Sequence, residues 1–271
     1  MRNRLTMLAA LLLAATPALA AGTLTYRGTV GQVAEYRVTT RAVGEQISLG
    51  QRRPINVETE YEVREEVLAC GADGSLHLQV TGRAVQVKDA THAFNGQRLD
   101  LPPLQVHVSA RGEILSAGAA TPGGAGMQAN AAAALLAQSL PMILPPGPVE
   151  PGGLWQWERS GASQENRLVE IAGEGPRIAR ITGTARAPIA FQERSEALGL
   201  TSDLTGTEAQ TSTLDLSLDS GVTLRHKGIL SLQTKTEVKM ESSEGSRSFA
   251  IELRLRVDFD SRLVKLDGKP V

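Results

Sequence analysis

Two long stretches near the C-terminus alternate apolar and polar residues with period two, and this pattern restricts the chain to a β-rich fold. The stretches Leu230–Met240 and Ile251–Phe259 place apolar or small side chains at every second position, with charged or polar residues between them. Period two gives a strand one buried face and one solvated face. The intervening Glu241–Arg247 is polar and contains Gly245, so the sequence predicts a long antiparallel hairpin.

The N-terminal half carries the same alternation. Val57–Val67 alternates apolar residues with charged ones, and Leu76–Val80 resumes the pattern after an Asp73-Gly74 turn. Alternation with short polar turns is typical of an antiparallel sheet with one solvated face. Shorter strands are predicted at Leu24–Gly28, Val33–Arg41, Leu104–Ser109 and Glu113–Ala117.

One segment, Gly124–Leu140, has a helical pattern instead. It is rich in alanine, which favours helix formation. Glu113 is the only charged residue between positions 112 and 149, so we expect this helix to be buried on more than one side. Pro141 ends it, because proline disfavours helical geometry in the preceding residue. Apolar residues recur at four-residue spacing in two rows: Met127, Ala131 and Leu135, and Ala132, Leu136 and Leu140.

A proline-rich connector follows the predicted helix and leads directly to both tryptophans of the chain. Prolines at 141, 145, 146, 148 and 151 favour extended backbone and cannot donate sheet hydrogen bonds. Trp155 and Trp157 then occupy alternate strand positions, so both side chains point to one face. They are interpreted as anchors in the core beneath the helix or as one wall of a ligand cavity.

The strand–turn–strand pattern recurs on both sides of the helix and connector. It favours a single β-rich domain over residues 21–271, with a first half at 21–120, the helix and connector at 121–153, and a second half at 154–271. An internal duplication would explain the recurrence. Because β-hairpins resemble one another by default, independent hairpins would explain it as well.

The first twenty residues have the features of a secretory signal peptide. Arg2 and Arg4 precede the apolar stretch Leu5–Ala15, and Ala18-Leu19-Ala20 forms a cleavage site. The apolar stretch is short for a membrane span, although an uncleaved anchor is the alternative. We therefore expect a periplasmic or secreted protein, and no later segment is apolar enough for a stable membrane span.

Charge and cysteine content narrow the possible partners. The formal net charge is −1, and the sequence contains no basic stripe, which argues against a nucleic-acid partner. Cys70 is the only cysteine, so no intramolecular disulfide can form. We interpret it as a small residue that closes a strand; a reactive thiol would need an activating histidine or cation nearby.

The sequence offers no candidate catalytic residue, metal site or cofactor motif. The histidines His77, His92, His107 and His226 are widely spaced and form no metal-binding motif. His226 is in phase with Leu224 and Leu230, which predicts a core or rim position, with a ligand contact as the alternative.

Glu65 is an unusual carboxylate, because it is in phase with the apolar residues Tyr61, Val63 and Val67. An uncompensated buried carboxylate is costly. A bulge that shifts the register or an exposed strand end would explain the position. The sharper alternative is a buried polar group that holds the head group of a ligand.

The stretch LPMILPPGPVEPGGLWQW at Leu140–Trp157 resembles a group of uncharacterised bacterial exported proteins, in which a helix ends in a proline-rich turn before a G-x-x-W strand. The resemblance covers the chain after the signal peptide in outline, but only this stretch in residues. It implies a strongly curved antiparallel sheet, a half-barrel, with one central helix packed on its concave face. That architecture is similar to periplasmic lipoprotein carriers and mycobacterial lipid-binding lipoproteins. The chain lacks their acylated cysteine, which puts membrane tethering in doubt.

These observations predict an exported protein that binds an apolar or amphipathic, lipid-like ligand between sheet and helix. The first alternative is a non-enzymatic structural or interaction module of the cell envelope, with a solid core and a protein partner. An enzyme has no motif in its favour. The residues expected to contact a ligand are Met127, Leu135, Leu136 and Leu140 from the helix, Trp155 and Trp157 after the connector, and Tyr61 and His226.

Overall fold

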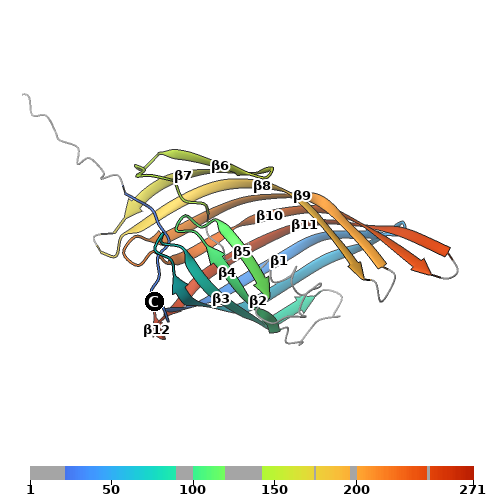
Figure 1. The fold of residues 1–271 in the computed structure, drawn as a ribbon, viewed down its shortest axis with the longest axis horizontal. Coiled ribbons are helices and arrows are strands. Elements are labelled where there is room, and N and C mark those ends of the chain that lie inside the picture. Colours follow the sequence, from blue (N-terminus) through green and yellow to red (C-terminus); the bar gives the residue numbers. More distant parts are fainter. Residues whose placement is uncertain (1–21, 90–99, 120–141, 174, 196–199, 243–244) are drawn as a thin grey trace, which may run out of the picture.

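The computed structural model describes residues 22–89, 100–119, 142–173, 175–195, 200–242 and 245–271, and these form one open antiparallel sheet (Figure 1). The prediction of a mainly β fold is confirmed. The predicted signal peptide and the predicted helix Gly124–Leu140, with Met127, Leu135, Leu136 and Leu140, lie outside the described residues, and those described contain no helix. The strands are β1 (Val33–Ser48), β2 (Gln51–Cys70), β3 (Leu76–Asp89), β4 (Asp100–Val108), β5 (Ile114–Ala119), β6 (Leu154–Arg159), β7 (Ala162–Ala172), β8 (Ile178–Ser195), β9 (Leu200–Ser217), β10 (Thr223–Ser242), β11 (Gly245–Leu266) and β12 (Lys269–Pro270).

The strand order is β5-β4-β3-β2-β1-β11-β10-β9-β8-β7-β6, with the short β12 paired to β11. The predicted hairpin near the C-terminus is confirmed as β10 and β11. From β1 at the centre of the sheet, the chain runs strand by strand to the edge strand β5. It then continues at the opposite edge with β6 and runs back to β11 beside β1. Both runs proceed in the same direction across the sheet, as a tandem duplication would require; the duplication itself stays a prediction.

The sheet is strongly curved around one concave face (Figure 1). Glycines on that face permit neighbouring strands to approach closely. A β-carbon at Gly228 would overlap the backbone oxygen of Thr211 on β9, and one at Gly44 would overlap that of Arg254 on β11. Glycines at such positions let a sheet bend without steric strain.

The predicted strand at Leu24–Gly28 is wrong, because this segment pairs with turns instead of with a strand. Tyr26 N donates to Ala110 O, and Arg27 N donates to Gly221 O. Leu24 is fully buried and Tyr26 nearly so. Any extended segment with one buried side alternates in this way, so period two could not distinguish a strand from an extended segment packed inside the curved sheet.

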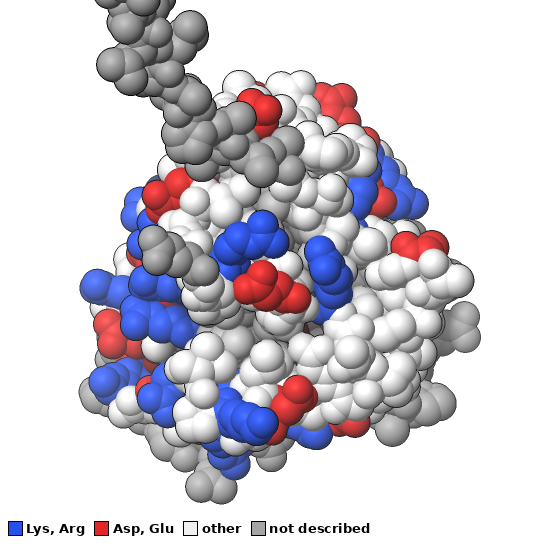
Figure 2. Space-filling view, turned by 90° about the vertical axis from the view of Figure 1, so that its left-hand side faces the viewer, with Lys and Arg blue, Asp and Glu red and all other residues white. Residues whose placement is uncertain are grey.

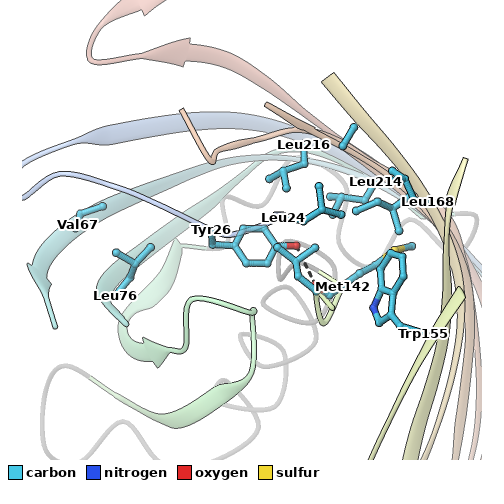
Figure 3. Packing of buried hydrophobic residues seen from close by; sticks show 12 residues of the cluster. Leu24, Tyr26, Val67, Leu76, Met142, Trp155, Leu168, Leu214 and Leu216 are labelled. Atoms are coloured by element: carbon cyan, nitrogen blue, oxygen red, sulfur yellow. Dashed lines mark hydrogen bonds between the residues drawn. The ribbon is translucent and has the colours of Figure 1, made fainter. Parts of the chain in front are cut away.

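Buried side chains gather at one end of the concave face, in two adjoining clusters that we call the packed end. Figure 3 shows the first of them. The N-terminal segment lies among strands from both halves of the sheet. The first cluster comprises Leu24, Tyr26, Val67, Leu76, Met142, Leu144, Trp155, Leu168, Ala179, Ile181, Leu214 and Leu216, and the second Ala34, Tyr36, Val38, Val63, Val80, Leu104, Val106, Val108, Val222 and Leu263.

Candidate functional site

A short segment that we call the strap, Met142–Pro145, lies between the two edges of the open sheet. All four of its residues are buried. On one side, Leu144 N donates to Arg111 O at 2.8 Å, and Arg111 Nε donates to Leu144 O at 2.8 Å. On the other side, Ile143 N donates to Gln164 Oε1 on β7 at 2.7 Å. The strap therefore satisfies its backbone groups with partners from both edges of the sheet.

The two tryptophans complete this connection. Trp155 is packed in the first cluster beside Met142 and Leu168 (Figure 3), and its Nε1 donates to Ile143 O at 2.7 Å. Trp157 is half-buried, and its Nε1 donates to Glu113 Oε1, just before β5, at 2.5 Å. Trp155 thus takes the position expected of a core anchor, whereas Trp157 joins edge strand β6 to the turn before the opposite edge strand.

The other two described candidates lie elsewhere. Tyr61 packs against the second cluster, and burial raises its pKa despite a hydrogen bond with Thr59 that lowers it. His226 is 1% exposed and meets the Phe259 ring edge-on, with ring centroids 5.1 Å apart. This is the predicted core position. The cavity beside Glu65 and the hollows around Arg37, Arg41 and Glu165 contain none of the four described candidates, Trp155, Trp157, Tyr61 and His226.

Glu65 faces inward at a small cavity of about 70 Å³ in the packed end. Its register with Ala34 on β1 and Val80 on β3 is regular, so no bulge turns it outward. The residue keeps a partly exposed surface, but its carboxyl group is surrounded by protein, and burial raises its pKa to about 7. No described residue donates a hydrogen bond to it. Arg27 borders the same cavity, but its Nε donates to Thr25.

Beyond the packed end, the concave face continues as a surface that we call the distal wall. Its inward side chains are half-buried for the most part, while most of their outward neighbours on the same strands are exposed. Cross-strand register places them in continuous rows. The wall comprises Ala42 and Gly44 of β1, Ile55 and Val57 of β2, Ala185, Ala187 and Ile189 of β8, Leu204, Gly206, Glu208 and Gln210 of β9, Leu230, Leu232, Thr234, Thr236 and Val238 of β10, and Ile251, Leu253, Leu255 and Val257 of β11.

The outward face of the sheet is charged, in contrast. Arginines pair with carboxylates of the same or a neighbouring strand, as Arg37 does with Glu60 at 3.0 Å. Partial burial acts to raise the pKa of Asp260, but hydrogen bonds from Arg225 and Arg262 outweigh it and hold the pKa at about 2. Charges of both signs intermingle on the surface seen in Figure 2. Exposed pairs of this kind contribute little each, and they favour water on this face.

Two histidines that are distant in sequence meet on this outward side. His77 of β3 and His107 of β4 stack with ring centroids 3.9 Å apart and planes 27° apart. Stacked rings point their nitrogen lone pairs in nearly parallel directions, which is unsuited to chelating one ion. In the described part of the chain, no group of three or more His, Cys, Asp or Glu side chains could hold a metal, and no helix is long and apolar enough to cross a membrane.

Comparison with known proteins adds no relative: no family model matches the chain, and no curated protein does. The resemblance to exported half-barrel proteins therefore stays a prediction. Glu208 is the functional candidate that sequence reasoning missed. It lies in β9, where threonine and serine interrupt the apolar alternation, and its inward orientation becomes clear only from its pairing with Leu232 and Ala187.

The bond between Trp157 and Glu113 should couple the two edges of the sheet energetically. In a double-mutant cycle of Trp157→Phe and Glu113→Ala, we expect a coupling free energy of about 1 to 2 kcal/mol in urea unfolding, because each single change removes the same hydrogen bond. The control cycle pairs Trp157→Phe with Glu158→Ala, an exposed neighbour, and should be additive. Additivity in the Glu113 cycle as well would contradict the connection.

The Glu65 carboxyl should make stability depend on pH. Because its pKa is raised in the folded state, its favourable contribution is complete below pH 4.5 and is lost as the pH rises through about 7. The full difference corresponds to about 3 kcal/mol. In urea unfolding, Glu65→Gln should therefore stabilise the protein at pH 8 and have little effect at pH 4.5.

The control for this test is Glu66→Gln, which changes a carboxylate that pairs with Arg64 instead. It should leave the pH dependence of unfolding at its wild-type form between pH 5 and 8. Parallel pH curves for wild type and Glu65→Gln would show that the Glu65 carboxyl does not titrate differently on folding.

Proposed function

We propose that this chain is an exported protein that binds an apolar or amphipathic, lipid-like molecule on the concave face of its sheet. The observation that carries the proposal is the distal wall. Its rows of leucine, isoleucine, valine and alanine face inward and remain partly accessible, although the opposite faces of the same strands carry charges. Partly accessible apolar surface that is continuous over several strands is a common feature of ligand sites.

The division of the concave face supports this proposal. At the packed end, the N-terminal segment and the strap fill the space inside the sheet, and the cavity beside Glu65 is only about 70 Å³. A lipid-like ligand would not fit there. The distal wall offers a longer surface, since β10 alone contributes inward side chains from Leu230 to Val238, about 26 Å at the rise of an extended strand.

A larger hollow of the described surface is poorly suited to an apolar ligand. It has a volume of about 710 Å³, lies on the outward side and is lined by charged residues such as Arg37, Glu62 and Arg83. Arg37 pairs with Glu60, and Arg83 with Glu62. Transferring an alkyl chain there would desolvate charged groups without compensation, so the inward wall is the better site.

A charge placed in the distal wall should weaken binding of an apolar probe. We expect Leu232→Lys to lower the affinity for the neutral dye Nile red at least about tenfold, because the change removes a leucine contact and introduces an ammonium group. The matched control is Gln233→Lys, which adds the same charge on the exposed side of the same strand. Fluorescence titration measures both affinities, and circular dichroism confirms folding.

Two results would oppose the proposal. If the wild-type protein does not bind Nile red, the distal wall is not an accessible apolar site. The better-supported function is then the alternative, an interaction module with a solid core. If both lysine variants bind the dye as tightly as wild type does, the dye site lies outside the distal wall.

A further inference from the structure

Glu208 is the one carboxylate among the inward residues of the distal wall, and the exposed Arg53 follows Ile55 in the inward row of β2. It lies on β9 and pairs in register with Leu232 on β10 and Ala187 on β8. The next inward positions along its own strand are Gly206 and Gln210. The carboxyl group is therefore surrounded mainly by apolar or small groups.

The described residues around Glu208 provide no partner for its oxygens. The nearest inward amide on the same strand belongs to Gln210, whose Nε2 donates to Ser212 Oγ at 3.0 Å and is engaged away from the carboxylate. No described side chain forms a hydrogen bond or ion pair with Glu208. Burial raises the pKa of the carboxyl group, in agreement with this setting.

This position differs from that of the charged residues on the opposite face. Arg254 and Arg256, which project outward from β11 at the level of the wall, each have carboxylate partners within 4 Å. A carboxylate in an apolar surface without a partner costs free energy, and a bound group that donates hydrogen bonds would offset this cost. The wall therefore has a long uncharged surface with a single negatively charged acceptor, Glu208.

We infer that Glu208 binds the head group of the ligand, and that this head group donates hydrogen bonds, as an alkylammonium or hydroxyl group does. This inference rests on the proposed function and narrows its ligand class. The hydrocarbon part lies along the inward rows of β10 and β11, where Leu232 and Leu255 are direct cross-strand neighbours. An anionic head group such as a carboxylate is disfavoured, because two negative charges would meet in apolar surroundings.

Probes of equal chain length separate the head group from the hydrocarbon chain. Displacement of Nile red by dodecylammonium and by dodecanoate at pH 8 gives the affinity of each. In the wild-type protein, we expect dodecylammonium to bind at least about tenfold more tightly, since an ion pair in an apolar setting is worth more than one in water. Glu208→Gln should remove this preference by weakening the amine and strengthening the carboxylate.

Two further variants make the test specific. Asp203→Asn changes a carboxylate on the outward side of the same strand, where it accepts a hydrogen bond from Gln192, and should keep the wild-type preference. Glu208→Leu extends the apolar wall, so it should fold, bind the neutral Nile red at least as tightly as wild type does, and show no preference for the amine.

The outcomes distinguish this inference from the function on which it rests. If neither C12 probe nor Nile red binds the wild-type protein, the proposed function fails. If all of them bind and Glu208→Gln leaves the preference for dodecylammonium unchanged, the ligand site stands and the role of Glu208 is overturned. A wild-type preference for dodecanoate would also overturn that role.

Discussion

The hydrogen bonds of the strap connect the two edges of a sheet that does not close on itself. An open, strongly curved sheet leaves unpaired backbone groups at its edge strands and an apolar inner face at risk of exposure. Residues near both edges bind the strap at one end of the sheet. Arg111 donates a hydrogen bond to Leu144 O, while Trp155 and Asn166 donate to Ile143 O. Trp157 adds a direct bond to Glu113. Because these contacts fix one end, the rest of the sheet can keep its curvature without packing its inner face against itself.

This arrangement divides the concave face into two parts with different roles. The packed end has a dense core, built from the N-terminal segment, the strap and strands of both halves, and it provides most of the buried apolar surface. The distal wall has the same period-two pattern, but its inward side chains stay partly accessible. On the proposed function, the packed end provides stability and the distal wall binds the ligand. Glu65 and Glu208, two inward carboxylates with raised pKa, illustrate the division, because Glu65 borders a small cavity and Glu208 an extended wall.

The sequence predicted the local features well and the distant contacts poorly. Period two predicted the β10–β11 hairpin and the inward face of β2, because these follow from alternation alone. The same pattern predicted a strand at Leu24–Gly28, which is wrong, because an extended segment inside a curved sheet alternates in the same way. The prediction that Trp155 and Trp157 share a face was useful, but their partners Ile143 and Glu113 depend on how the sheet curves. Sequence reasoning missed Glu208 because its surroundings depend on the register of β9 with β8 and β10. The sequence of a single strand does not determine that register.

Native mass spectrometry of the full chain, purified without detergent from the cells that naturally produce it, shows whether the distal wall holds an apolar molecule. Organic extraction of the same sample then identifies any bound molecule. We expect a stoichiometric adduct that dissociates on denaturation and is recovered as an amphipathic compound with a hydrocarbon chain. A protein that is free of adducts, and that stays so after incubation with lipid extract from those cells, would show that the distal wall holds no such molecule.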